Sequence, residues 1–159
     1  MIKENINDFF NDTQRIGPFL GIDLGEKRVG LSISDRTQSI ASNYATIEKK
    51  KFSLFSLDLQ AIIDKEIICG IVIGLPLNMD GSEGPKCQST RHFAKNFSTL
   101  VNLPITFWDE RLTTVAAERS LLSADLSRKK RKRVVDSVAA VLILQNLLDR
   151  LKYIQHKNT

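Results

Sequence analysis

The spacing of apolar residues predicts two strands joined by a tight turn near the start of the chain. The first strand, Phe19–Asp23, is apolar up to its last residue, and the second, Arg28–Ser34, alternates apolar residues with small or polar ones. Gly25 lies between them, and glycine accepts the positive φ of a tight turn at little steric cost. Asp23 is the exception to this pattern, because a carboxylate in such an apolar strand requires a partner.

The rest of the chain continues with alternating helices and strands. The run Ile67–Ile73 is continuously apolar, which is typical of a strand that is buried on both faces in a parallel pair. The other predicted elements are a strand over Ala41–Ile47, helices over Phe52–Lys65 and Lys86–Val101, a strand over Ile105–Glu110, a helix from Thr113 or Thr114 through about Ser123, and a final helix over Val134–Lys152. This order predicts an α/β fold in which helices cover the faces of a mixed sheet.

The length of 159 residues favours a single domain. We expect this domain to span residues 18–153 and to be followed by a short tail at 154–159. Residues 1–17 precede the first predicted strand and mix charges of both signs. We expect them to form a flexible, loosely ordered extension with a short helix around Ile6–Phe10.

Composition limits the location and the metal chemistry of the protein. No apolar run approaches the ~20 residues needed to cross a bilayer, and Met1–Gly17 lacks the apolar core of a signal peptide. The sequence therefore predicts a cytoplasmic protein that makes no membrane contact. Cys69 and Cys87 form no C-x-x-C pair, and His92 and His156 are too few and too far apart for a zinc site. A bound metal would have carboxylate ligands, which favours Mg²⁺ or Mn²⁺.

Positive charge is concentrated in one segment of a chain whose net charge is +5. An unbroken basic run consists of Arg128, Lys129, Lys130, Arg131, Lys132 and Arg133. A charged run is usually a solvated helix face, but six consecutive cations cannot all be spread apart on one helix. We therefore expect this run to bind a polyanion, and nucleic acid in particular.

Carboxylates recur at the ends of the predicted strands and at the start of the final helix. Asp23 ends the first strand, Asp109 and Glu110 end the last, and Asp136 begins the closing helix. Taken singly, each has an ordinary explanation, such as a turn cap for Asp23 or a favourable helix dipole for Asp136. Brought together, they would repel one another unless a cation neutralised them, and two divalent ions held in this way can clamp a phosphodiester. A metal nuclease is one prediction that follows.

Four motifs in this order closely resemble those of the YqgF family. They are Gly21-Ile22-Asp23-Leu24-Gly25-x-Lys27-Arg28-Val29-Gly30, Gly74-Leu75-Pro76-x-x-Met79-Asp80-Gly81-Ser82, Asp109-Glu110-Arg111-Leu112-Thr113-Thr114 and Asp136-Ser137-x-Ala139-Ala140. Members of this family are described as pre-16S rRNA nucleases and Holliday-junction-resolvase homologues with an RNase H-like fold. The resemblance extends over about 19–151, so it leaves out the N-terminal segment.

The resemblance implies an RNase H-like, five-stranded mixed sheet in which two parallel strands continue three antiparallel ones. It also implies that Asp23, Glu110 and Asp136 are the catalytic and metal-binding acids. Successive residues of a strand point to opposite faces, so Asp109 would point away from such a site if the strand persisted that far. The choice between Asp109 and Glu110 therefore stays open at this point.

A loop rich in glycine and proline follows the buried strand and runs from Gly74 to Pro85. In open α/β sheets, ligands gather at the carboxyl ends of strands, although a plain connecting loop explains the composition equally well. The resemblance makes this loop a substrate-contacting element, with Gly74, Leu75, Pro76, Asn78, Gly81 and Ser82 as its candidate residues. Lys27, Arg28 and Arg111 are candidates for further nucleic-acid contact, and surface ion pairs are the alternative for the first two.

Together these features predict a nuclease that uses Mg²⁺ or Mn²⁺ and processes the 5′ end of pre-16S rRNA. The closest alternative keeps the chemistry and cuts branched DNA at a Holliday junction. A non-catalytic nucleic-acid-binding factor is a second alternative, and an actin-like ATPase is disfavoured because the chain offers a single phosphate loop. Expected partners are structured RNA, branched DNA or a pre-ribosomal particle, and we expect a monomer or a weak homodimer.

Overall fold

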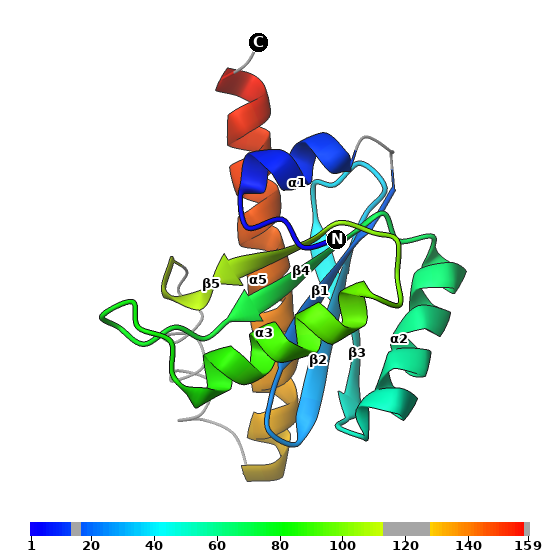
Figure 1. Cartoon of the computed structure of the whole chain (residues 1–159), viewed down its shortest axis with the longest axis vertical. Coiled ribbons are helices and arrows are strands. Elements are labelled where there is room, and N and C mark those ends of the chain that lie inside the picture. Colours follow the sequence, from blue (N-terminus) through cyan, green and yellow to red (C-terminus); the bar gives the residue numbers. More distant parts are fainter. Residues whose placement is uncertain (14–16, 113–127, 158–159) are drawn as a thin grey trace.

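A five-stranded mixed sheet with the strand order β3-β2-β1-β4-β5 forms the centre of the molecule (Figure 1). The computed structural model describes residues 1–13, 17–112 and 128–157, and for 128–137 it describes the backbone alone. The strands are β1 (Phe19–Leu24), β2 (Arg28–Ser34), β3 (Ala41–Glu48), β4 (Gly70–Leu75) and β5 (Ile105–Asp109). Antiparallel pairs join β1 to β2 and β2 to β3, whereas β4 is parallel to both β1 and β5. The predicted sheet of three antiparallel strands continued by two parallel ones is confirmed.

Helices cover both faces of this sheet (Figure 1). The helical elements are α1 (Ile6–Asp12), α2 (Phe52–Glu66), α3 (Pro85–Ser98), the 3₁₀ turn η1 (Glu110–Leu112) and α5 (Arg128–Lys157). Helices α2 and α3 lie on one face, and the long helix α5 crosses the other, which we call the α5 face. None of the helices in the described residues is long and apolar enough to span a membrane.

The hydrophobic core is divided by the sheet into two layers. Leu20 and Ile22 of β1 belong to the layer that contains Phe97 of α3. Val72 of β4 belongs to the opposite layer, together with Ile143 of α5. This division follows from the alternation of side chains along each strand, which sends neighbouring residues to opposite faces.

Helix α5 approaches the sheet closely over the middle of β1. A Cβ at Gly21 would lie 2.2 Å from Ser32 Oγ, 3.0 Å from Leu144 Cβ and 3.2 Å from the Ala140 carbonyl oxygen. Ser32 Oγ donates a hydrogen bond of 2.7 Å to that same carbonyl oxygen. Because glycine places no side chain between β1 and α5, the helix can rest directly on the strand.

The N-terminal segment contains the short helix that its sequence predicts, α1 at Ile6–Asp12, and it packs against the domain rather than extending loosely from it. Phe9 of α1 is fully buried and its ring lies 5.4 Å from that of Phe19. Ile2 forms a parallel bridge with Ile105, and Lys3 N donates to the Ile105 carbonyl oxygen at 2.7 Å. The difference has a physical cause, because one aromatic anchor and an open strand edge give this short segment enough contacts to order it.

Two predicted boundaries also differ from those in the structure. Helix α5 begins at Arg128, six residues before the predicted start at Val134, so the basic run lies in its first turns. Lysine and arginine are good helix formers, and no glycine or proline interrupts the run. Strand β4 begins at Gly70 rather than at Ile67, which instead ends α2 in the left-handed conformation with φ 55°. The helix predicted through Ser123 lies outside the described residues.

Replacing Gly21 with alanine should destabilise the fold, since the new methyl group would overlap Ser32 Oγ. We expect Gly21→Ala to lower the free energy of unfolding by about 1–3 kcal/mol, the usual cost of overpacking a core. Urea titration followed by circular dichroism would measure it. Gly84→Ala is the control, because its nearest neighbour atom would lie 3.5 Å away. Equal stability losses in the two variants would contradict this account of the β1–α5 contact.

Candidate functional site

The carboxyl ends of β1, β4 and β5 meet at one edge of the sheet. Ile22 is paired with Ile73, and Ile73 is paired with Phe107 across the two parallel ladders. The residues that follow, Asp23 in β1 and Gly74 in β4, are therefore neighbours at this edge. Parallel strands lie about 4.8 Å apart, so side chains from these three strand ends can share one small volume.

Asp23 occupies a buried position on the α5 face. Its side chain follows the direction of Gly21, two residues earlier, whose missing side chain would point at Ala140 of α5. Asp23 is 4% exposed and is paired with Gly30 in the antiparallel ladder. A glycine opposite Asp23 leaves space beside the carboxylate on the same face.

Glu110 extends from η1 back over β4. A Cβ on Gly74 would lie 2.8 Å from Glu110 Oε1 and 2.4 Å from Ile143 Cδ1, so the carboxylate lies above the glycine on the α5 face. Since β4 lies between β1 and β5, this places the Glu110 carboxylate on the side of the sheet that also carries Asp23. A side chain at Gly74 would collide with Ile143 and with the Glu110 carboxylate, so glycine at this position lets the carboxylate lie over β4.

Asp109 has a different environment from that of Glu110. Its carboxylate accepts three hydrogen bonds from the Arg111 guanidinium, the shortest being 2.7 Å from Nη2 to Oδ2. Partial burial raises the pKa of Asp109, but the hydrogen bonds and the charge of Arg111 outweigh burial and hold that pKa below its ordinary value. Of the two adjacent acids, the geometry therefore favours Glu110 as the one that faces Asp23.

Asp136 lies in the third turn of α5, and its side chain is outside the described residues. It comes four residues before Ala140 and seven before Ile143, both of which are fully buried. Helical periodicity places such positions on the same side of a helix, the side that α5 turns toward the sheet. Among the side chains that are described, no group of three His, Cys, Asp or Glu residues gathers closely enough to hold a metal.

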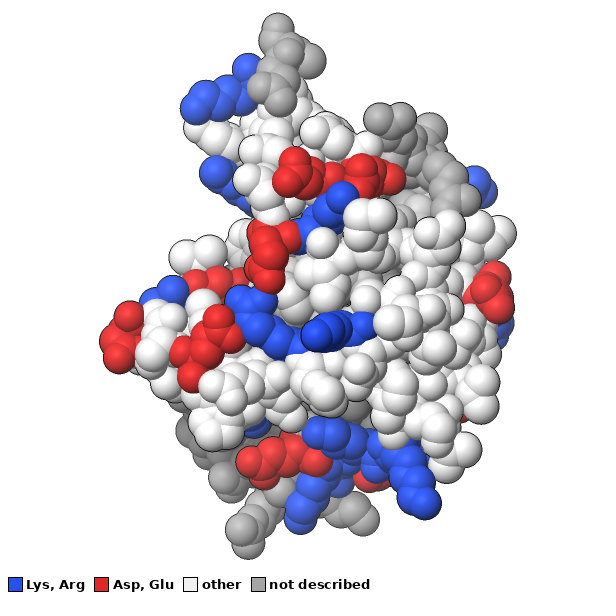
Figure 2. Space-filling view, viewed as in Figure 1, with Lys and Arg blue, Asp and Glu red and all other residues white. Residues whose placement is uncertain are grey.

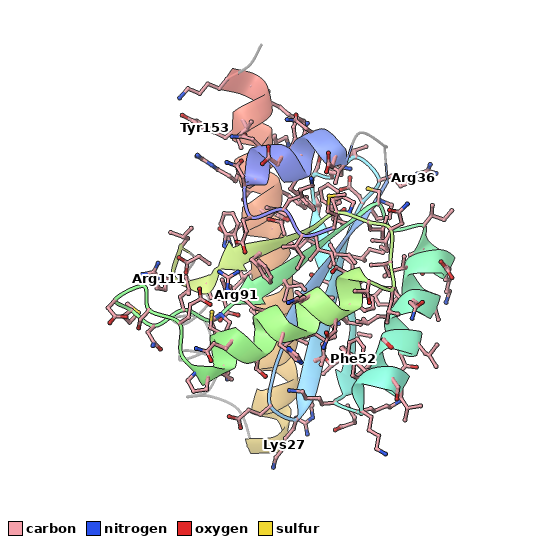
Figure 3. The ribbon with its side chains drawn as sticks, in the orientation of Figure 1. Lys27, Arg36, Phe52, Arg91, Arg111 and Tyr153 are labelled. Atoms are coloured by element: carbon pink, nitrogen blue, oxygen red, sulfur yellow. The ribbon has the colours of Figure 1, made fainter. Side chains whose placement is uncertain are left out.

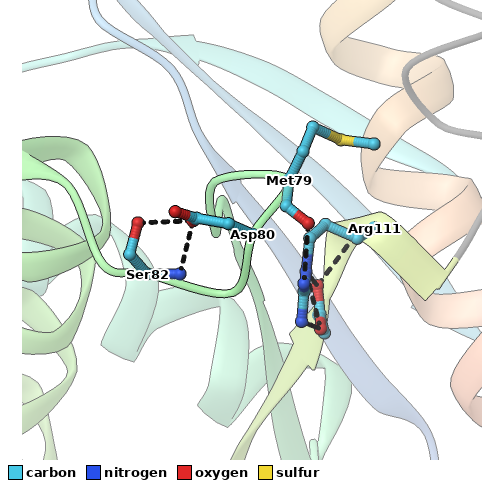
Figure 4. Close-up of polar contacts among 5 residues, drawn as sticks. Met79, Asp80, Ser82 and Arg111 are labelled. Atoms are coloured by element: carbon cyan, nitrogen blue, oxygen red, sulfur yellow. Dashed lines mark hydrogen bonds and ion pairs between the residues drawn. The ribbon is translucent and has the colours of Figure 1, made fainter.

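The loop after β4 is held to the end of β5 by Arg111 (Figure 4). Arg111 Nη1 donates to the Met79 carbonyl oxygen at 3.2 Å while its other nitrogens hold Asp109. Within the loop, Asp80 Oδ1 accepts bonds from Ser82 N and Ser82 Oγ at 2.9 and 2.6 Å. These bonds from Ser82 lower the pKa of Asp80. Gly81 has φ +90°, a conformation that favours glycine and closes the turn.

Arg91 of α3 holds the far end of the same loop and was not singled out by the sequence pattern. Its Nε donates to Glu83 Oε1 at 2.6 Å, its Nη1 forms an ion pair with Glu4, and its guanidinium lies 5.0 Å from the centre of the Phe107 ring. Figure 3 shows Arg91 and Arg111 on the same side of the molecule. No local spacing could have indicated Arg91, because its partners are distant in sequence.

The predicted basic contacts fall into three groups. Lys27 is exposed at the β1–β2 turn, and Figure 3 shows it at the end of the molecule. Arg28 is mostly buried and pairs with Glu48, with 3.5 Å between Nε and Oε1. Arg111 pairs with Asp109, so it acts first as an anchor for the loop. The side chains of Arg128 to Arg133 lie outside the described residues.

The architecture and the paired strand ends define an RNase H-like fold. The solved structure of T. thermophilus RuvC in complex with a Holliday junction substrate shares this fold, with a TM-score of 0.54 at 10% identity over 86% of this chain and 96% of that chain. A second Thermus thermophilus RuvC structure has a TM-score of 0.50 over 85% of this chain and 96% of its own length, also at 10% identity.

The family model described as "RuvX: Holliday junction resolvase" matches residues 17–150, and the chain belongs to this family, which is also called YqgF. A relative from Ruegeria pomeroyi, named "Putative pre-16S rRNA nuclease", is 53% identical over 96% of this chain and 99% of its own length. A relative of the same name from Rhodobacter capsulatus is also 53% identical, over 97% of both chains. The resemblance noted in the sequence is confirmed.

Removing the guanidinium of Arg111 should release the loop without unfolding the domain. We expect Arg111→Gln to raise the equilibrium constant for opening of the loop severalfold, because the variant loses the charge-assisted bonds to Asp109 and to the Met79 carbonyl oxygen. Amide hydrogen exchange at Gly81, whose N–H bonds to the Asn78 carbonyl oxygen at 2.8 Å, would measure it. Arg36→Gln, at an exposed turn far from the loop, should leave this exchange unchanged. Unaltered exchange in Arg111→Gln would show that the loop is held by other contacts.

Proposed function

We propose that this RuvX-family protein is a divalent-metal-dependent nuclease that hydrolyses phosphodiester bonds at the shared edge of β1, β4 and β5. The observation that supports it most is the placement of two carboxylates from different segments, Asp23 and Glu110, on the α5 face with Gly74 between them. A buried acid beside a second acid is unfavourable in a protein that has no cation to bind. The arrangement is therefore consistent with the protein ligands of a metal site.

The donor set suits Mg²⁺ or Mn²⁺, because both ions prefer carboxylate oxygens to nitrogen or sulfur. Asp23 and Glu110 would hold the metal, and Asp136 would complete the set from the third turn of α5. When bound, such ions polarise the phosphodiester and lower the pKa of the attacking water. The chain's own contribution is to fix the carboxylates on rigid elements, with Gly74 allowing the Glu110 carboxylate to lie directly over β4.

The proposed substrate is structured RNA, and in particular the 5′ end of pre-16S rRNA. The support is the name shared by relatives that are 53% identical over nearly the whole chain. This substrate would bring the protein to a pre-ribosomal particle in the cytoplasm. Branched DNA is the second candidate, and it is supported by the description of the family model as a Holliday junction resolvase.

Nucleic acid would be held mainly through its phosphates. We assign this role to the basic run Arg128–Arg133 in the first turns of α5, next to Asp136 in the same helix. Lys27 is exposed and can add a phosphate contact, whereas Arg28 and Arg111 already have carboxylate partners. Arg111 would act by positioning the loop from Gly74 to Ser82 near the substrate. Phosphate contacts carry no sequence information, so the choice of cutting site would depend on nucleic-acid shape.

Asp23→Asn should abolish metal-dependent cleavage while the fold is retained. Losing one ligand that contributes several kcal/mol to the transition state should slow cleavage by about 10²- to 10³-fold or more. The assay is cleavage of a 5′-extended small-subunit rRNA precursor and of a four-way DNA junction, each with and without Mn²⁺. Asp64→Asn, at an exposed position of α2, is the matched control. Unimpaired cleavage by Asp23→Asn would refute the mechanism, and the substrate that is cut decides between RNA and DNA.

Mn²⁺ should also raise the melting temperature of the wild-type protein, because a ligand that binds only the folded state stabilises it. The same titration on Asp23→Asn should give little or no rise. This measurement needs no substrate, so it separates a nuclease that lacks a partner from a binding factor whose acids are structural. A rise of equal size in both proteins would place the metal elsewhere.

Neutralising part of the basic run should weaken binding to every nucleic acid alike. The triple variant Lys129→Gln, Arg131→Gln, Arg133→Gln should reduce the slope of log affinity against log salt by up to about 0.9 per lost duplex phosphate contact. Fluorescence anisotropy at several salt concentrations would measure the slope. A triple variant at Lys65, Lys95 and Lys152 carries the same change in net charge and should retain most of the wild-type slope. If the two triples have equal slopes, the run is not the interface.

A further inference from the structure

A pocket lies at the same edge of the sheet as the acids but on the opposite face. It has a volume of ≈ 550 Å³ and lies between the β1–β2 turn, the start of α2 and the first three turns of α3. Its wall at the turn consists of Leu24, Gly25 and Glu26, so the pocket begins at the residue that follows Asp23. Asp23 and Leu24 point to opposite faces of β1, so the acids and the pocket lie on opposite sides of this strand.

The floor of this pocket is aromatic. Phe93 of α3 lies at the centre of a ring cluster, 5.9 Å from Phe52, 5.4 Å from Phe55 and 5.6 Å from Phe97. Phe52 is 38% exposed, and in Figure 3 it lies between α2 and α3. A large ring left open to solvent at the mouth of a pocket offers a surface on which a planar group can stack.

The rim of the pocket is basic. Lys49, Lys50 and Lys86 line it, against Glu26 as the single acidic residue among the described lining. Lys50 pairs with Asp58 at 3.1 Å, and Lys49 Nζ donates to the Gly25 carbonyl oxygen at 3.3 Å. In the described part of the chain, Lys86 makes no ion pair. Figure 2 shows basic side chains gathered at this end of the molecule, over the β1–β2 turn and the start of α2.

The first turn of α3 adds hydrogen-bond donors to the rim. Gly84, the residue before the helix, supplies no capping side chain, and Lys86 and Ser89 of the first turns line the pocket. Uncapped amides and the positive end of the helix dipole favour an anion. A purely apolar ligand would make no use of the lysines and amides at the rim, and a small anion alone would leave the exposed ring unused.

A nucleotide combines the two chemistries that this pocket presents, namely a planar aromatic base and a phosphate. We propose that the pocket binds one unpaired nucleotide of the substrate, with its base against Phe52 and Phe93 and its phosphate near Lys86. The assignment rests on the proposed nuclease function, which supplies the nucleic acid. It adds a substrate class to that function: a duplex or folded region that carries a single-stranded flank, which passes around the β1–β2 turn from one face of the sheet to the other.

Binding of fluorescent RNA duplexes with and without a single-stranded flank tests the proposal. The measurement is made in EDTA, so cleavage plays no part, and flanks on the 5′ and 3′ ends are compared. Phe52→Leu should weaken binding of a flanked duplex by about 5- to 150-fold, which is the range for loss of one base stack. Phe52→Trp should retain the affinity. Leu57→Ala, at an exposed site on the same helix outside the pocket, is the control.

The salt dependence of binding provides an independent test of the same site. Lys86→Gln should reduce the salt slope for the flanked duplex by about 0.7, the value for one single-strand phosphate, and should leave a blunt duplex unaffected. Lys95→Gln, exposed on the same helix and outside the pocket, should leave both slopes unchanged. Wild-type affinity and salt slope in both Phe52→Leu and Lys86→Gln would overturn the proposal.

Two outcomes distinguish this proposal from a mononucleotide site and from the nuclease assignment itself. If AMP binds in a manner that depends on Phe52 and the flanked duplex does not compete with it, the pocket is a mononucleotide site and the proposal is wrong. If the flank binds as expected while the wild type cleaves neither RNA nor DNA with Mn²⁺, the nuclease assignment fails and the pocket assignment stands. Cleavage that proceeds normally with no effect of the flank on affinity counts against the pocket alone.

Discussion

The direct seating of α5 on the central strand is the constraint on which the rest of the structure depends. Gly21 leaves no side chain between helix and strand, and the hydrogen bond from Ser32 to the Ala140 carbonyl oxygen fixes the helix in both height and rotation. Helical periodicity puts position 136 on the same side of α5 as Ala140 and Ile143, so this seating also bears on the proposed metal site. Packing of the core and assembly of the proposed metal site are therefore one requirement, satisfied by one small residue.

Much of the fold was predictable from the residue pattern, because a strong apolar periodicity identifies strands and helices directly. The choice between Asp109 and Glu110 was not, since it depends on where β5 stops. The chain leaves the strand after Asp109 and turns into a 3₁₀ helix, which lets Glu110 reach over Gly74. The sequence pattern cannot supply that boundary, because neither a glycine nor a proline marks the end of the strand between Trp108 and Leu112.

Contacts between distant segments account for most of the other differences. The order of the N-terminal segment depends on Phe9 and on an open strand edge, neither of which is visible in local spacing. The pocket is similar: helical periodicity marks Phe52 and Phe93 as apolar positions but cannot tell a ring packed in the core from one that lies at a surface recess. Whether a ring is packed in the core or lies at a recess depends on how α2 and α3 pack together.

The bridge between Ile2 and Ile105 has a consequence for the behaviour of the protein in solution. An edge strand presents unpaired N–H and C=O groups, and such a strand can recruit a copy of itself from another molecule. Here β5 reads Ile-Thr-Phe-Trp-Asp, a segment with high strand propensity, and residues 1–3 cover part of its free edge. The short N-terminal segment thus shields the sheet from edge-to-edge aggregation, a protective role that requires no contact with nucleic acid.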